Sequence, residues 1–124
     1  MDEPRGEFNV AAIQQRLREF AAVRDWEQFH SPKNLAMALA AEAGELLEIF
    51  QWLTEQQSGD LSGSDRAQVS AELADVQIYL LRLADVLDID LPEAVDSKID
   101  ENERRYPVKL SKGNAVKYSQ RGSE

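Results

Sequence analysis

Residues 40–52 read AAEAGELLEIFQW, and this stretch places three glutamates three residues apart among Ala, Leu, Ile, Phe and Trp. The glutamates are Glu42, Glu45 and Glu48. An ionised carboxylate is costly to bury unless a counter-charge compensates it. On a helix, Glu42 and Glu45 project from one side because they are separated by three residues. The stretch therefore predicts a helix whose carboxylates lie close to a cation.

A second acidic pair has the same spacing. Glu72 and Asp75 lie in AELADVQIYLL, residues 71–81, again between apolar side chains. If the two helices pack as neighbours, four carboxylates converge, and such close like charges raise one another's pKa unless a cation neutralises them. Oxygen ligands alone suit a hard cation such as Mg²⁺ or Mn²⁺. Either pair alone is also compatible with a solvated helix surface. Glu48 could be a further metal ligand, a catalytic base or a solvated side chain.

Capping signals and apolar periodicity divide the chain into helices. Asn9, Ser31 and Asp90 can each cap a helix, and Pro32 suits a first helical position. Pro107 discourages continuation of the last helix. No segment shows the alternation typical of a strand. The sequence predicts an all-α, four-helix bundle-like fold with helices at about residues 9–25, 32–56, 65–87 and 90–105.

The composition limits the partners. The chain has 124 residues, no cysteine and a formal net charge of −9. An acidic surface repels nucleic-acid backbones and anionic membranes, so we expect neither as a partner. An anionic substrate would need a metal cation between itself and the protein. The N-terminal stretch MDEPRGEF lacks the apolar region of a secretory signal, and we expect a soluble cytoplasmic protein.

We expect one domain, residues 1–108, followed by a basic, flexible C-terminal tail, residues 109–124. The tail contains four Lys or Arg residues and one Glu, in contrast to the acidic remainder. It is compatible with a solvated, disordered segment and with a mobile segment that folds over an anionic ligand or a neighbouring subunit. The sequence leaves both interpretations open.

A di-iron carboxylate bundle is the main competing metal site. Such a site normally takes a Glu-x-x-His motif from each of two helices. His30 is the only histidine in the chain, and Glu27, three residues before it, lies in an aromatic connector rather than on a bundle helix. The di-iron interpretation is therefore excluded.

The acidic pattern and its flanks resemble a known family. E-x-x-E followed by E-x-x-D, together with RDWEQFHSPKNL, GELLEIFQW, ELADVQIYLLRLAD and DLPEAVDSKIDENERRYP, resembles the MazG-like all-α nucleoside triphosphate pyrophosphohydrolases. Within this superfamily, residues 13–107 are similar to the dCTP pyrophosphatase branch. The resemblance implies Mg²⁺-dependent hydrolysis of a (deoxy)nucleoside triphosphate to the monophosphate and pyrophosphate. It also implies a homo-oligomer, a tetramer built as a pair of dimers.

The resemblance also implies roles for individual residues. The metal ligands would be Glu42, Glu45, Glu72 and Asp75, and the catalytic base would be one of Glu42, Glu45 and Glu48. The substrate-binding residues would be Trp26, His30, Trp52, Tyr79, Lys98, Asn102 and Arg105. Leu17 stands where we expect a histidine in this branch, which weakens the expectation of strict selectivity for cytosine nucleotides.

The leading hypothesis is a pyrophosphohydrolase that removes dCTP or a modified cytosine nucleotide from the pool, as housecleaning. A non-catalytic nucleotide- or metal-binding helical module is the first alternative, although a scaffold has no physical need for four buried carboxylates. A related pyrophosphatase acting on dUTP or a phosphoribosyl nucleotide is the second. Trp26 and Trp52 favour the first hypothesis over this last one.

Overall fold

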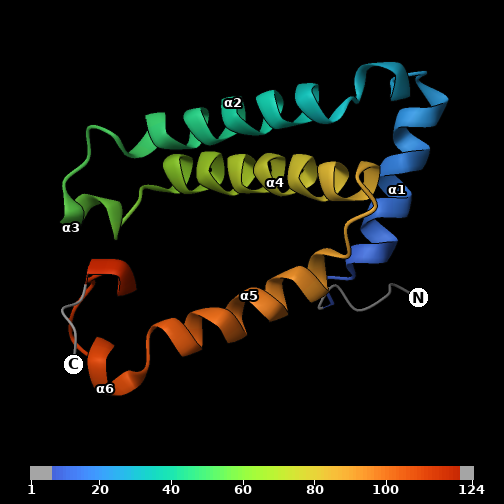
Figure 1. Cartoon of the computed structure of the whole chain (residues 1–124). Coiled ribbons are helices and arrows are strands. Elements are labelled where there is room, and N and C mark those ends of the chain that lie inside the picture. The colour runs from blue at the N-terminus through green and yellow to red at the C-terminus, as the bar shows by residue number, and fades with distance from the viewer. Residues whose placement is uncertain (1–6, 121–124) are drawn as a thin grey trace. The chain divides into compact units, whose positions relative to one another are not determined.

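The computed structural model describes residues 7–120, and every regular element in that range is helical (Figure 1). The prediction of an all-α protein is confirmed. The described residues divide into two compact units, 7–89 and 90–120. Each unit is described by itself.

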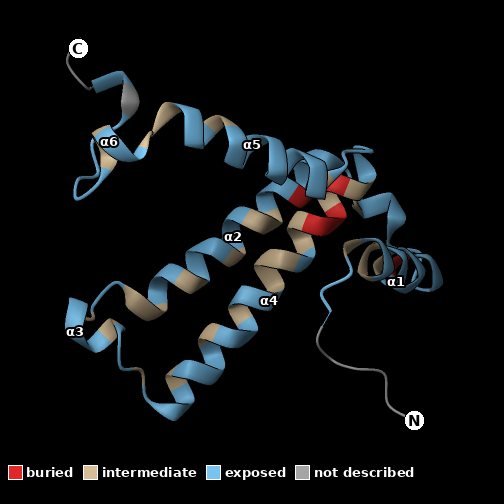
Figure 2. Ribbon diagram, turned by 90° about the horizontal axis from the view of Figure 1, so that it is seen from below, coloured by how far each residue is buried: buried red, intermediate tan, exposed pale blue. Residues whose placement is uncertain are grey.

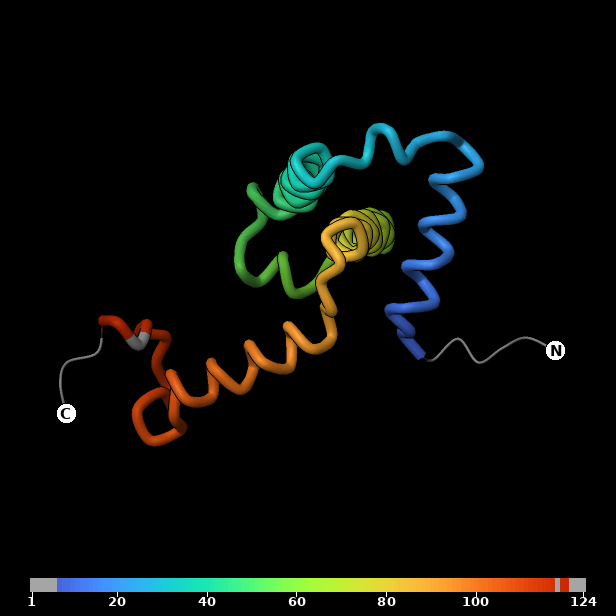
Figure 3. The backbone as a smooth tube through the Cα atoms, turned by 45° about the vertical axis from the view of Figure 1, so that its right-hand side comes forward, coloured from blue at the N-terminus to red at the C-terminus, as the bar shows by residue number. Residues whose placement is uncertain are grey.

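The first unit is built on an antiparallel helix pair. It contains α1 (Val10–Val23), the 3₁₀ turn η1 (Glu27–Phe29), α2 (Pro32–Phe50), the short α3 (Glu55–Ser58) and α4 (Gly63–Val86). The α2 and α4 helices lie side by side, and α1 packs across α4. Figure 3, in which α2 and α4 are seen nearly end-on, shows the same arrangement. The predicted neighbours that carry the two acidic pairs are therefore in contact.

Polar caps start the long helices. In each case a side-chain oxygen accepts a hydrogen bond from the backbone N–H three residues further on, which satisfies one of the free amides of the first turn. The capping residues are Asn9, Ser31, Ser62 and Asp90. The predictions at Asn9, Ser31 and Asp90 are confirmed, and α4 starts two residues before the predicted position.

The second helix ends earlier than predicted. We expected it to continue to about Gln56, but α2 ends at Phe50. A capping box is the reason, because Thr54 Oγ1 accepts from Gln57 N while Gln57 Oε1 accepts from Thr54 N. This reciprocal pair starts α3 and requires extended backbone at Thr54. Trp52 consequently lies on a turn, with 85% of its surface exposed.

The apolar core lies at one end of the α2–α4 pair. Figure 2 shows the buried positions gathered where the end of α1, the start of α2 and the end of α4 meet. The buried apolar side chains among the described residues are Ala21, Leu35, Leu81 and Ala84. Towards α3, the facing side chains of α2 and α4 are only half-buried. Apolar contacts therefore hold one end of the helix pair more strongly than the other.

Polar contacts attach α1 to α4 beside this core. Arg18 Nη1 donates to Asp85 Oδ1 at 2.6 Å, and Gln14 Nε2 donates to the carbonyl oxygen of Leu81 at 3.0 Å. Asp85 also pairs with Arg82, whose Nη1 lies 3.5 Å from Asp85 Oδ2. These contacts fix the position of α1 along α4.

The second unit contains α5 (Leu91–Arg105), α6 (Val108–Ser111) and the 3₁₀ turn η2 (Tyr118–Gln120). The fourth predicted helix is thus confirmed as α5. Part of the predicted tail forms the end of α6 and η2, whereas residues 121–124 lie outside the described range. Flexibility of the tail stays a prediction.

A left-handed backbone conformation at Asp88 follows the end of α4. Replacing Asp88 tests whether this conformation is strained. Asp88 has φ 55°, and Ile89 N donates to the carbonyl oxygen of Ala84 across the helix end. Glycine adopts this conformation without a Cβ penalty. We expect Asp88→Gly to raise the free energy of unfolding by about 0.5 kcal/mol, measured by urea denaturation. Asp88→Ala removes the same charge but keeps the strain, and a gain equal to that of Gly would contradict this explanation.

Candidate metal and ligand site

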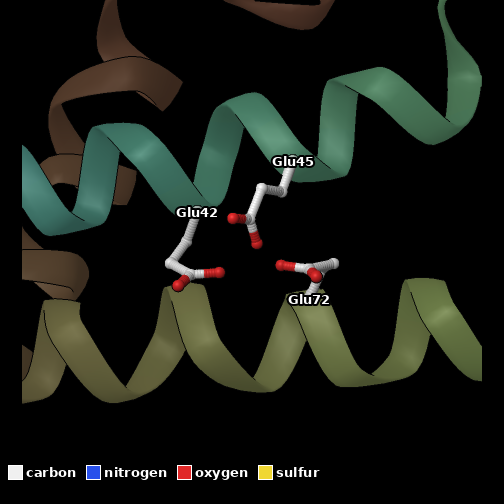
Figure 4. Close-up of side chains that lie close together, drawn as sticks. All are labelled: Glu42, Glu45 and Glu72. Carbon is white, nitrogen blue, oxygen red and sulfur yellow. The ribbon is translucent and has the colours of Figure 1, made fainter.

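Three carboxylates converge between α2 and α4. Glu42 and Glu45 project from α2 towards Glu72 of α4, as Figure 4 shows. One oxygen of each residue lies within 4.8 Å of the others. The spacing of three residues on α2 and the antiparallel packing of α4 produce this arrangement. We call Glu42, Glu45 and Glu72 the acidic cluster.

Two oxygens of the acidic cluster are buried without a hydrogen-bond partner, Glu42 Oε2 and Glu72 Oε2. An unpaired buried oxygen costs free energy that a bound cation or proton would recover. All donors in the cluster are carboxylate oxygens, the ligands of hard divalent cations. The acidic cluster therefore fits a metal ion and could hold one.

Proximity to the neighbouring acids raises the pKa of Glu42 to about 7. The largest cause is the hydrogen bond that a protonated Glu42 can make with Glu72, followed by desolvation, the corresponding hydrogen bond with Glu45 and the charges of Glu45 and Asp75. Without a cation, a proton shared between Glu42 and Glu72 takes over part of the neutralising role at neutral pH.

The raised pKa predicts how the stability of the metal-free protein depends on pH. The folded state binds the extra proton more tightly than the unfolded state, in which Glu42 has a pKa of 4.5. The contribution of Glu42 to stability is therefore fully present below about 4.5 and is lost as the pH rises through about 7. We expect the melting temperature in EDTA to fall between pH 5 and pH 8, and Mg²⁺ to reverse the fall.

Glu42→Gln is the control, because the amide does not titrate. The difference in melting temperature between wild type and Glu42→Gln should change across this pH range, measured by scanning calorimetry. A constant difference would contradict the assignment to Glu42.

The two other predicted acids lie outside this group of three. Asp75 is half-buried on α4, and its charge acts on Glu42, so it lies near the acidic cluster. Glu48 is exposed on α2, one turn after Glu45. Their roles as ligand and base stay predictions.

A cavity of about 410 Å³ lies between α1, the connector after it and α4. Three of the predicted substrate-binding residues line it together, Trp26, His30 and Tyr79, while Trp52 does not. The remaining lining residues are Ile13, Arg16, Leu17, Phe20, Ile78 and Arg82. Phe20 and Trp26 pack edge to face, with ring centroids 5.6 Å apart. The cavity therefore has aromatic and aliphatic walls with a few polar groups, as small-molecule sites do.

The α4 helix connects the cavity to the acidic cluster. Asp75 and Tyr79 are four residues apart, which places them on one face of α4 with about 6 Å between them along the axis. Glu72 lies one turn before Asp75 on that face. A ligand with an aromatic end and an anionic end could contact both parts at once.

The remaining predicted residues, Lys98, Asn102 and Arg105, all lie on α5 in the second unit. Lys98 and Arg105 pair with Glu101, and the pKa of Glu101 is lowered first by its hydrogen bond with Lys98 and then by the charge of Arg105. Asn102 accepts a backbone hydrogen bond from Tyr106 at the end of the helix. Their contact with a substrate stays a prediction.

Arg82, Arg16, Phe20 and Ile78 line the cavity but were not predicted as site residues, and neither was Ile13. A signal existed for Arg82, because it is the one charged residue in the apolar run YLLRLA. The others sit where α1 crosses α4, and the crossing depends on tertiary packing.

Comparison with known proteins gives the family. The model of the MazG-like family matches residues 37–120, and the chain belongs to this family. The resemblance noted in the sequence is confirmed. Within the described residues, no helix is long and apolar enough to cross a membrane.

Among curated relatives, dCTP pyrophosphatase 1 of Bos taurus is 53% identical over 103 residues, and that of Homo sapiens is 52% identical over 104 residues. Each alignment covers 82% of this chain and 61% of the relative, so the chain spans about three fifths of their length. A dATP/dGTP diphosphohydrolase of Cyanophage S-2L is 38% identical over 58 residues, which is 47% of this chain and 55% of the relative. A pyrophosphatase from Archaeoglobus fulgidus has a similar crystal structure, with a TM-score of 0.76 and 40% identity over 86% of this chain and 99% of that one.

Proposed function

We propose that this protein is a Mg²⁺-dependent pyrophosphohydrolase of deoxynucleoside triphosphates, with dCTP or a modified dCTP as the preferred substrate. One observation carries the proposal: the acidic cluster, with two unpaired buried oxygens, shares α4 with an aromatic cavity. A metal site beside a base-sized cavity matches a nucleotide with its phosphates. The names of the bovine and human relatives support dCTP, and the archaeal neighbour supports the reaction class.

The residues of α2 and α4 divide the chemistry between them. Glu42, Glu45 and Glu72, with Asp75, would hold Mg²⁺, which supplies charge neutralisation for the triphosphate and a lower pKa for attacking water. A glutamate among Glu42, Glu45 and Glu48 accepts the proton as the water oxygen bonds to the α-phosphorus. The bond from the α-phosphorus to the α–β bridging oxygen breaks, and pyrophosphate leaves with the electron pair.

The cavity would receive the nucleobase. Trp26 offers an aromatic surface that is 44% exposed, and stacking of a base on such a ring is worth about 1–3 kcal/mol in other systems. Leu17 forms an apolar part of the wall, which suits a base with an apolar 5-substituent. Lys98, Asn102 and Arg105 are proposed to contact the nucleotide phosphates, and Trp52 to contact the base. The family resemblance supports these last roles.

The active form is proposed to be a homotetramer built as a pair of dimers. Large apolar side chains stay exposed on α2 and α4, among them Met37, Leu47 and Leu73. A second copy that covered them would remove apolar surface from water. The basic tail would then have an anionic ligand or a neighbouring subunit to fold over, and the enzyme would act on the cytoplasmic nucleotide pool as housecleaning.

A product analysis tests the reaction. Wild type and Glu45→Gln are incubated with Mg²⁺ and a panel of common and 5-modified dNTPs and NTPs, and products are separated by chromatography. We expect monophosphate and pyrophosphate from wild type, most rapidly from cytosine deoxynucleotides, and no turnover by the variant. Glu19→Gln, which removes an exposed carboxylate from α1, should retain the wild-type rate. Nucleotide binding without any turnover in wild type would overturn the proposal and favour a binding module.

A further inference from the structure

Arg82 is a charged residue in the core end of the first unit. It is 8% exposed, and it lines the cavity from α4. Burying a guanidinium is costly unless its hydrogen bonds and charge are satisfied. Its Nη1 lies 3.5 Å from Asp85 Oδ2, and its Nε donates to His30 Nδ1 at 3.1 Å. One side of Arg82 is therefore anchored on α4, and the other side engages the connector.

The contact with Arg82 determines which nitrogen of His30 carries a proton. A guanidinium has only donors, whereas a neutral imidazole has one donor and one acceptor nitrogen. Since Nδ1 accepts from Arg82 Nε, the proton of the neutral ring must lie on Nε2. Among residues 7–120, no hydrogen bond is formed with Nε2 of His30, which lines the cavity.

We infer that Arg82 is a positioning residue that holds His30 as the neutral Nε2–H tautomer, so that the cavity presents a fixed hydrogen-bond donor to an acceptor on the bound base. This role rests on the proposed function insofar as the ligand is a nucleotide. Cytosine has the hydrogen-bond acceptors N3 and O2, to which the Nε2–H of His30 could donate. The exocyclic amino group of cytosine is itself a donor, so it is disfavoured next to Nε2–H. Arg82 would thus influence how the base enters the cavity through its hold on His30.

The charges around His30 support the neutral ring. Burial lowers the pKa of His30, the charge of Arg82 lowers it further, and Glu27 on the same connector acts in the opposite direction. Arg16 of α1 and Tyr79 of α4 are the other titratable groups that line the cavity with it.

Nuclear magnetic resonance of the free protein tests the tautomer directly, because His30 is the only histidine in the chain. Long-range ¹H–¹⁵N correlation spectra distinguish the two tautomers and the imidazolium. We expect wild type at pH 7 to show Nε2–H with unprotonated Nδ1. Arg82→Met should raise the pKa of His30 and shift its ¹⁵N signals towards a mixture of tautomers. Arg18→Met, which breaks the outer pair with Asp85 but does not contact His30, should leave the spectrum unchanged.

An imidazolium or an Nδ1–H tautomer in wild type at pH 7 would overturn the inference, as would a wild-type spectrum in Arg82→Met. Arg82→Leu also removes every donor at this position, and it serves if Arg82→Met fails to fold by circular dichroism. Mixed tautomers in Arg82→Leu support the role of Arg82, whereas the wild-type tautomer would overturn it.

Kinetics test the consequence for the substrate. We expect Arg82→Met to raise the KM for dCTP about tenfold, as for the loss of one hydrogen bond, with kcat within about twofold of wild type. An unchanged KM would overturn the role in base selection. If wild type hydrolyses no nucleotide, the proposed function fails, while the spectra of the free protein still decide the role of Arg82 at His30.

Discussion

Glu72→Gln is expected to reduce the rate of nucleotide hydrolysis by more than about 100-fold, because loss of a residue proposed as a direct metal ligand should exceed the 10–100-fold cost of losing an outer-shell partner. The same substitution should raise the melting temperature of the metal-free protein. Glu72 contributes an unpaired buried oxygen and the largest effect on the pKa of Glu42. A glutamine amide can donate to the Glu42 carboxylate, which relieves the repulsion between the carboxylates of residues 42 and 72.

Two measurements check this pair of effects: initial rates at saturating Mg²⁺, and thermal melting in EDTA at pH 8. Glu19→Gln removes one exposed carboxylate and controls for the change in net charge, and neither quantity should move. A fall in both activity and metal-free stability would mean that Glu72 supports the fold rather than a metal. Retained activity would remove Glu72 from the site.

Leu81→Ala is expected to lower the free energy of unfolding by about 3 kcal/mol. Leu81 is 1% exposed, and it belongs to a core of few fully buried side chains between α1, α2 and α4. Gln14 Nε2 of α1 donates to the carbonyl oxygen of Leu81, and this hydrogen bond limits how far α1 can collapse onto α4 to fill the space left by the missing atoms. A large part of the total stability of a domain of this size would be lost.

Urea denaturation followed by circular dichroism measures this loss. Val23→Ala on α1 is the comparison, because Val23 is 79% exposed and its truncation should change stability by less than about 0.5 kcal/mol. Equal effects of the two substitutions would mean that the core does not lie where the structure places it.

Features that depend on residues close in the chain were predictable from the sequence. Asn9, Ser31 and Asp90 cap their helices as expected, because a cap uses the amide three residues further on. The convergence of Glu42, Glu45 and Glu72 followed from spacing and from the packing of two apolar faces. The predicted end of α2 is wrong although Thr54 and Gln57 have the spacing of a capping box, because the apolar periodicity of the sequence continues past Phe50 to Leu53.

Features that depend on how α1 crosses α4 were not predictable in this way. The cavity forms where side chains far apart in sequence meet, and the pairing of Arg82 with His30 spans 52 positions. Trp52 lies on the turn that the capping box creates and does not line the cavity with Trp26, so its contact with the base stays a proposal. No local sequence pattern specifies contacts between residues so far apart in the chain.

The continuous α4 helix sets the distance between the acidic cluster and the cavity. Glu72 and Asp75 lie near its middle, Ile78, Tyr79 and Arg82 line the cavity from its C-terminal part, and the helical rise fixes the interval between the two groups. One residue inserted between Asp75 and Tyr79 would rotate the second half by about 100° and turn the wall away from the acids. Substitutions can therefore adjust either end of the site separately, whereas insertions and deletions within this interval cannot be absorbed. Under the proposed function, the backbone of α4 would therefore set the distance between the phosphates and the base of the substrate.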